Sequence, residues 1–121
     1  MESWWEFLHK HLDMKLRECQ SILNNLDSTD FAQRARQDYG GEGLPLGVSS
    51  FLYDNLDWDP ETHLCNARMD LEVTDQALIW ASEEADIVAI GYLKQYQILL
   101  TEACIILQDL ARLGVPTVAF Y

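Results

Sequence analysis

Carboxylates and aromatic rings alternate in a short stretch near the middle of the chain, SSFLYDNLDWDPE at residues 49–61. This combination suits two kinds of chemistry. The carboxylates could coordinate a cation, or the stretch could contact a protein partner, with the rings providing short-range packing and the carboxylates providing charge. The partner-binding patch that this stretch predicts consists of Tyr53, Asp54, Asp57, Trp58, Asp59 and Glu61.

The spacing of possible ligands argues against a metal site in and after this stretch. An EF-hand loop that begins at Asp57 has Thr62 where it needs glycine and Arg68 where it needs a bidentate glutamate. His63 and Cys65 would share one face of a strand, but two ligands do not make a zinc site. We therefore expect no metal and no cofactor.

Charge is distributed very unevenly along the 121 residues. The formal net charge is -12, and residues 37–86 hold twelve acids against one base, Arg68, which leaves -11 in that segment. Such a field repels nucleic acids and anionic membranes and attracts cationic partners. We expect a basic protein partner, such as a toxin or a nuclease, and no direct binding to nucleic acid or membrane. The alternative is that the acids only keep the protein soluble.

The N-terminal third predicts a long amphipathic helix. Apolar residues between Trp5 and Leu26 recur every three or four positions, which lays one stripe along a helix of about 25 residues. Ser3 is expected to cap its start, with Glu6 as the partner in a capping box.

A second, short helix is predicted by DFAQRARQDYGG at residues 30–41, with Ser28 or Asp30 as its N-cap. Residues 1–39 would then form a helical hairpin. The glycine-rich residues that follow, GGEGLPLGVSS, begin a loop region that extends over residues 40–62. No strand precedes these glycines and no lysine follows at P-loop spacing, so we do not expect phosphate binding there.

The pattern changes in the C-terminal half, residues 63–121. In HLCNARMDLEV, residues 63–73, apolar and polar residues alternate, which is typical of a half-exposed strand. Thr74 and Asp75 resemble an N-cap and first turn, so a short helix is expected next.

The stretch ADIVAIGYL, residues 85–93, is rich in β-branched residues and predicts a strand buried on both faces. A helix over residues 94–113 follows, then Gly114 and Pro116 as stop signals, then TVAFY at residues 117–121 as another strand. These elements make a βαβ unit, and the fold class they predict for this single domain is α/β or α+β. The alternative is an all-α fold with one long helix from Asp75 to Leu113.

The segments TDQALIWASEEADIVAIGYL and TEACIILQDLARLGVPTVAFY, about 50 residues, resemble the second half of nucleoside 2-deoxyribosyltransferase-like proteins, which are α/β proteins. The resemblance implies a nucleoside- or nucleotide-handling enzyme. In that case Glu102 would match the nucleophilic glutamate and Asp75 the upstream aspartate of the base site. The other reading of Glu102 is an ordinary, partly exposed helix residue.

Two classes of function follow from these observations. The favoured one is a small acidic binding or inhibitor protein, of the immunity-protein or antitoxin type, rather than an enzyme. The alternative is the nucleoside-handling enzyme, and a homodimer is an open possibility for either. The cytoplasm is the expected location, since Cys19, Cys65 and Cys104 show no CxxC pairing and no basic region or long apolar stretch suggests export or a membrane span.

Overall fold

The computed structural model describes residues 3–38 and 60–114, and within these ranges every element is a helix. The helices are α1 (Trp4–Asp27), α2 (Asp30–Asp38), α4 (Pro60–Glu83) and α5 (Ile87–Leu113). No strand occurs in this part of the chain, so the predicted α/β fold class is wrong and the described fold is all-α.

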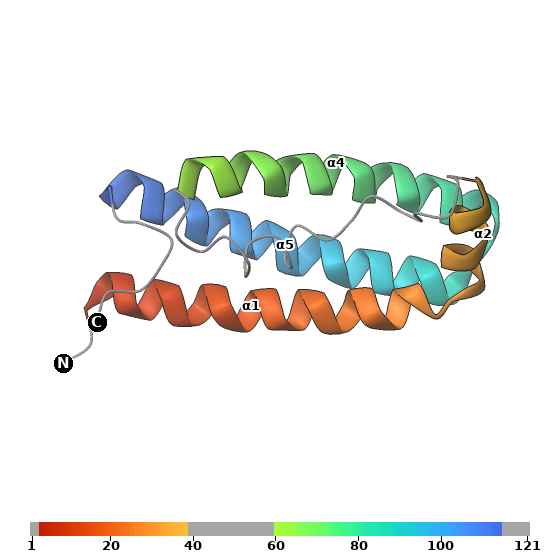
Figure 1. The fold of residues 1–121 in the computed structure, drawn as a ribbon, viewed down its shortest axis with the longest axis horizontal. Helices are drawn as coiled ribbons and strands as arrows, with labels where there is room; N and C mark the ends of the chain where they lie inside the picture. The colour runs from red at the N-terminus through yellow and green to blue at the C-terminus, as the bar shows by residue number, and fades with distance from the viewer. Residues whose placement is uncertain (1–2, 39–59, 115–121) are drawn as a thin grey trace.

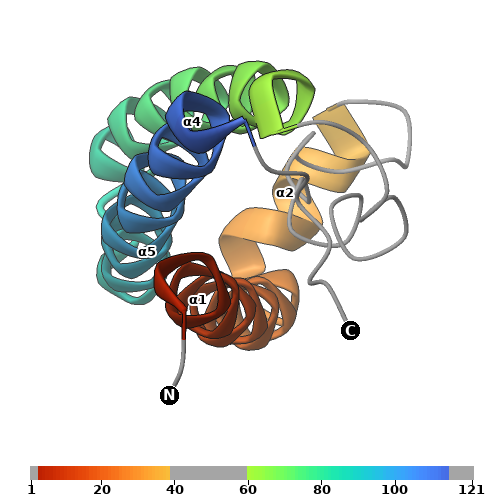
Figure 2. The same ribbon diagram turned by 90° about the vertical axis from the view of Figure 1, so that its left-hand side faces the viewer.

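Three long helices lie side by side, and α5 occupies the middle of them (Figure 1). Seen from the end, α1, α5 and α4 form an arc in which α5 packs against both of its neighbours (Figure 2). The start of α1 and the end of α5 lie at the same end of the molecule, so these two helices run antiparallel. The short helix α2 lies at the opposite end (Figure 1).

The main hydrophobic core joins α1, α4 and α5 and forms because each helix carries apolar residues at spacings of three and four. Its buried members are Leu8, Leu12, Leu16, Cys19, Leu64, Ala67, Tyr96, Leu100, Ala103, Cys104, Leu107 and Leu110. A second cluster packs α2 and the end of α1 against the turn between α4 and α5, and contains Leu26, Phe31, Ala77, Ala81, Ala89 and Leu93. Both clusters depend on α5, which is therefore the central element of the fold.

The two predicted N-terminal helices are confirmed, and so is Ser3 as the N-cap position of α1, but the predicted capping box and the predicted cap of α2 are wrong. Ser3 stands at the N-cap position of α1 and its side chain makes no capping hydrogen bond, so the capping box with Glu6 is not formed. In α2 the cap is Thr29, whose hydroxyl accepts a hydrogen bond from the backbone N–H of Ala32 at 3.2 Å.

The predicted strand at residues 63–73 is wrong, because this segment is the first half of α4. Several positions of α4 that face the core are polar, which hides the helical spacing from a count of apolar residues. Buried positions recur every three or four residues and are occupied by Pro60, His63, Leu64, Ala67, Asp70, Thr74, Ala77 and Ala81.

The predicted strand at residues 85–93 is also wrong, and with it the βαβ unit. Ile87, the first residue of α5, is 81% exposed, whereas Ala89 and Leu93 are fully buried, which is the spacing of a helix. The single helix from Asp75 to Leu113 is wrong as well, because the chain turns between α4 and α5. The other predicted strand, residues 117–121, lies outside the described residues, while Gly114 ends α5 as predicted, with a φ of 68°.

The turn between α4 and α5 is held by a pair of backbone hydrogen bonds and by a cap. The N–H of Ala85 donates to the carbonyl of Ser82, and the N–H of Asp86 donates to that of Ala81, which together make a Schellman motif. The carboxylate of Asp86 then accepts from the N–H of Ala89 at 3.1 Å and starts α5. Ala85 has a φ of 56° in this turn, a conformation that favours glycine.

Ala85→Gly is expected to raise the free energy of unfolding by about 0.5–1 kcal/mol. Glycine removes the clash of Cβ with the carbonyl in the left-handed region, and this gain exceeds the added flexibility of the unfolded chain. Urea denaturation would measure the change. Gln76→Gly, at an exposed interior position of α4, is the control and should lower stability by up to about 1 kcal/mol. Destabilisation by both substitutions would contradict the left-handed turn.

Candidate partner-binding face

Acidic side chains line the solvent-facing side of α4. The helix begins with Pro60, whose missing N–H costs nothing at that position, and Glu61 follows in the first turn, where a negative charge is favourable. Intervals of 11, 3 and 8 residues, close to whole helical turns, place its exposed acids on one side. The face that we call the α4 acidic face contains Glu61, Glu72, Asp75 and Glu83.

Among the described residues, most of these carboxylates form no ion pair, and α4 carries one base, Arg68, on the same side. With respect to the described part of the chain, Glu61, Glu72 and Glu83 form no ion pair. Asp75 accepts a hydrogen bond from the side-chain amide of Gln97 on α5, which brings no positive charge. The field of the α4 acidic face is therefore directed into solvent.

Two apolar side chains are exposed between the acids. Met69 is 60% exposed and Ile79 is 55% exposed. Methionine is enriched in protein interfaces because its flexible side chain adapts to different surfaces. The face therefore combines charge with apolar contact area.

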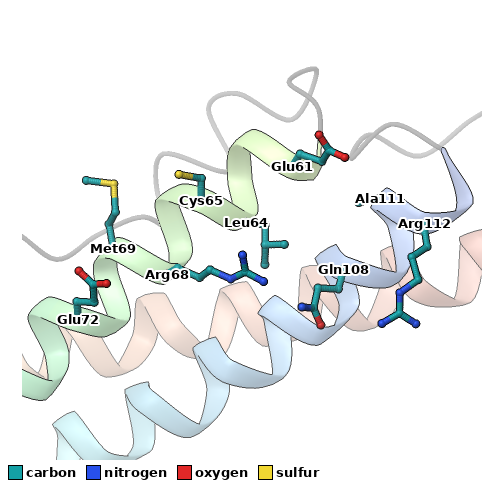
Figure 3. A pocket seen from close by; sticks show the side chains of 9 residues that line it. All are labelled: Glu61, Leu64, Cys65, Arg68, Met69, Glu72, Gln108, Ala111 and Arg112. Atoms are coloured by element: carbon teal, nitrogen blue, oxygen red, sulfur yellow. The ribbon is translucent and has the colours of Figure 1, made fainter.

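A groove runs between the first half of α4 and the end of α5 (Figure 3). It has a volume of about 540 Å³, and in Figure 3 the side chain of Arg68 points from α4 toward Gln108 on α5. Glu61 and Glu72 of the acidic face line the same groove. The remaining lining residues are Leu64, Cys65, Met69, Ala111 and Arg112. The groove joins the acidic face to exposed apolar and basic side chains.

Only one residue of the predicted patch falls in the described part of the chain. Glu61 lies exposed in the first turn of α4, at the edge of the groove. The other five lie outside the described residues, namely Tyr53, Asp54, Asp57, Trp58 and Asp59. His63 and Cys65, considered above as a ligand pair, are separated in α4: the histidine is buried and the cysteine is exposed.

The two residues singled out by the enzyme resemblance have separate surroundings. Glu102, on α5, forms an ion pair with Lys15 of α1, and this hydrogen bond raises the pKa of the lysine. Asp75 bonds to Gln97 instead. Neither carboxylate lines the groove between α4 and α5. Glu102 and Asp75 therefore have different contact partners and share no contact among these.

A buried polar cluster in the core was missed by the sequence analysis. The hydroxyl of Tyr96 on α5 donates to the carboxylate of Asp70 on α4, and the hydroxyl of Thr74 donates to the Asp70 carbonyl at 2.8 Å. Burial raises the pKa of the Cys19 thiol to about 12, with the nearby carboxylates of Asp70 and Glu18 adding to the effect. The signal in the sequence was the four-residue spacing of Asp70 and Thr74, which places both on one face of a helix. The hydrogen bond between Tyr96 and Asp70 joins α4 to α5 in the core.

Other kinds of site find no support in the described ranges. Within residues 3–38 and 60–114, no three His, Cys, Asp or Glu side chains gather as a metal site would require. In the same ranges, no helix has the length and apolar character to cross a membrane. In comparisons with known proteins, no family model, no curated protein and no solved structure matches the chain.

Proposed function

We propose that this chain is a small acidic binding or inhibitor protein, of the immunity-protein or antitoxin type, that engages a basic protein. The contact surface is the α4 acidic face together with the acidic and aromatic residues that directly precede α4 in the sequence. A toxin or a nuclease is the kind of partner that fits, because enzymes that act on nucleic acids carry basic surfaces.

The observation that carries this proposal is the exposure of acids without ion pairs to the described residues, in excess over one arginine, around apolar side chains on one helix. Charge that served only solubility would be favourable anywhere on the surface, and would not require Met69 and Ile79 to be exposed beside it. In a protein interface the two features have separate roles. The carboxylates accelerate association with a basic partner, and the apolar side chains slow dissociation.

The cytoplasm is the proposed location. All three cysteines, Cys19, Cys65 and Cys104, are free thiols, and the pKa values of the two buried ones are raised by burial. Free thiols persist in a reducing compartment.

The proposal is tested by capturing the partner from the native host in low salt and releasing it in high salt. Association rates of the isolated partner are then measured at two salt concentrations. A variant with Glu61, Glu72 and Glu83 replaced by Gln is expected to associate about tenfold more slowly in low salt, with a weaker dependence on salt, because steering by charge is lost.

A matched variant separates the acidic face from net charge. Replacing Glu6 and Glu18 by Gln and Asp30 by Asn also removes three exposed acids, but from α1 and α2. This variant should associate nearly as fast as the unmodified protein. Equal slowing in both variants would mean that only the total charge matters, and the α4 acidic face would lose its assigned role.

A further inference from the structure

The outward face of α5 is a second unusual surface, distinct from the α4 acidic face. Ile87, Ile98 and Ile105 are 81%, 58% and 54% exposed although they belong to the central helix of the fold. At about 100° per residue they lie with Gly91 within about 40° of one another around the helix axis. The helix, which lies between α1 and α4 in the arc of Figure 2, therefore presents a narrow apolar stripe to solvent.

Gly91 makes a shallow hollow in this stripe. A side chain added at this position would meet nothing within 4 Å, so the fold itself does not require glycine there. Glycine inside a helix costs about 1 kcal/mol relative to alanine. Close approach of another surface is a physical reason to have a glycine at an exposed interior position of a helix.

A groove lies next to Ile98, at the centre of the stripe. It has a volume of about 410 Å³ and runs between α1 and α5. Apolar side chains from both helices line it, with Ile98 itself on one wall. Its lining residues are Glu18, Ser21, Ile22, Gln95, Ile98 and Leu99. This groove offers contact area to an element that packs on the stripe.

The charges of α5 favour a second copy of the chain as the occupant. The helix carries two bases, Lys94 and Arg112, and two acids, Glu102 and Asp109, which sum to zero in a protein with a net charge of -12. A basic partner gains no attraction from a neutral face. A second acidic copy, in contrast, meets less repulsion there than at the α4 acidic face.

We propose that the outward face of α5 is a homodimer interface, in which two copies pack α5 against α5 in antiparallel orientation about a two-fold axis at Ile98. A two-fold axis places residues that are equally distant from Ile98 opposite each other. Gly91 and Ile105 are each seven residues from Ile98, so each isoleucine packs into the hollow at the glycine of the other copy. Lys94 and Glu102 are each four residues away, so the axis places opposite rather than like charges at the same level, while Glu102 keeps its ion pair with Lys15.

The proposed contact leaves the α4 acidic face uncovered. Packed helices cross at an angle of about 20° or 50°, so the contact is concentrated within two turns of the crossing point, from Gly91 to Ile105. Dimerisation through α5 and binding of a basic partner through α4 are therefore independent, and one can fail without the other.

Gly91→Gln tests the interface by producing opposite effects on folding and association. Glutamine is a better helix former and has open space around it in the monomer, so the melting temperature of the monomer should rise. The same side chain fills the hollow for Ile105 and should weaken dimerisation by at least about tenfold in sedimentation equilibrium. Ile79→Gln, on α4, is the control, because Ile79 is 55% exposed, close to the 54% of Ile105. This substitution lies outside the proposed interface and should leave dimerisation unchanged.

A disulfide tests the register. Helix axes about 8–10 Å apart, with Cα atoms about 2.3 Å from each axis, leave facing Cα atoms about 3.4–5.4 Å apart, and the upper part of this range is a distance that a disulfide spans. With the exposed Cys65 replaced by Ser, Ile98→Cys should give a cross-linked dimer on mild oxidation. Ile87→Cys should not, because its two copies would lie about 33 Å apart along the helices.

Three results would overturn the proposal. They are a monomer at every concentration at which the protein stays soluble, an equal effect of Gly91→Gln and Ile79→Gln on dimerisation, and a failure of Ile98→Cys to cross-link. Each result is obtained on the protein alone. None depends on whether a basic partner binds the α4 acidic face.

Discussion

Leu93→Ala is expected to lower the free energy of unfolding by about 2–5 kcal/mol, whereas Ile87→Ala and Val88→Ala should each change it by less than about 0.5 kcal/mol. All three residues lie in the stretch ADIVAIGYL. Leu93 is fully buried in the cluster between α2 and the turn from α4 to α5, and its truncation leaves a cavity. Ile87 and Val88 are exposed, so their truncation removes few contacts. Urea denaturation of the three variants measures the contrast.

If residues 85–93 formed a strand buried on both faces, the three alanine variants would differ from one another in stability in another way. In that case Ile87 and Val88 would point to opposite faces and both would be buried, so each truncation would be costly. A loss of more than about 2 kcal/mol in either variant would therefore contradict the helical start of α5. Measurements at low protein concentration keep association through α5 from contributing to the result.

The first third of the fold could be predicted from sequence because its local signals agree. The stripe from Leu8 to Leu26 is apolar at every buried position of α1 except His9, and polar residues occupy most of the others. The cap of α2 could not be predicted, for a geometric reason. Ser28, Thr29 and Asp30 are all good N-cap residues, and only the path of the chain after α1 selects Thr29.

The secondary structure of the C-terminal half of the chain was predicted wrongly because residue type does not follow burial there. Residues 85–93 have the β-branched composition of a strand, yet α5 exposes Ile87 and Val88 and buries Ala89. In α4 the opposite occurs, since Asp70 and Thr74 are buried while Met69 is exposed. Hydrophobic periodicity assumes that apolar residues face the core, and both segments depart from that assumption.

The candidate site was located in sequence by charge, but charge does not report burial. The acidic segment includes Glu61, Glu72 and Glu83, which are exposed on α4, but only Glu61 belonged to the predicted patch. It also included Asp70, which is only 6% exposed and accepts a hydrogen bond from Tyr96. A sum of charges counts all four alike. The helical periodicity of α4 was needed to separate the three exposed glutamates from the buried aspartate.

The stability of the protein should fall steeply in alkaline solution because of Cys19. Burial raises the pKa of this thiol from its ordinary value of 9.0 to about 12 in the folded protein. Below pH 9 the thiol is neutral in both states, and its contribution to stability is complete. Between pH 9 and pH 12 the unfolded chain loses the proton and the folded protein keeps it, so unfolding becomes more favourable. Three pH units correspond to a loss of about 4 kcal/mol.

Cys19→Ala separates this effect from the other groups that titrate at high pH. Below pH 9 the variant should be less stable than the unmodified protein by about 1–2 kcal/mol, because a small cavity replaces a sulfur atom that is fully buried between the helices. All other titratable groups are the same in the two proteins, so their contributions cancel in the difference. As the pH rises toward 12 only the unmodified protein loses the thiol contribution. The two curves of unfolding free energy against pH, measured by urea denaturation, are therefore expected to cross, and parallel curves would show that the thiol is not buried as the packing of α1 requires.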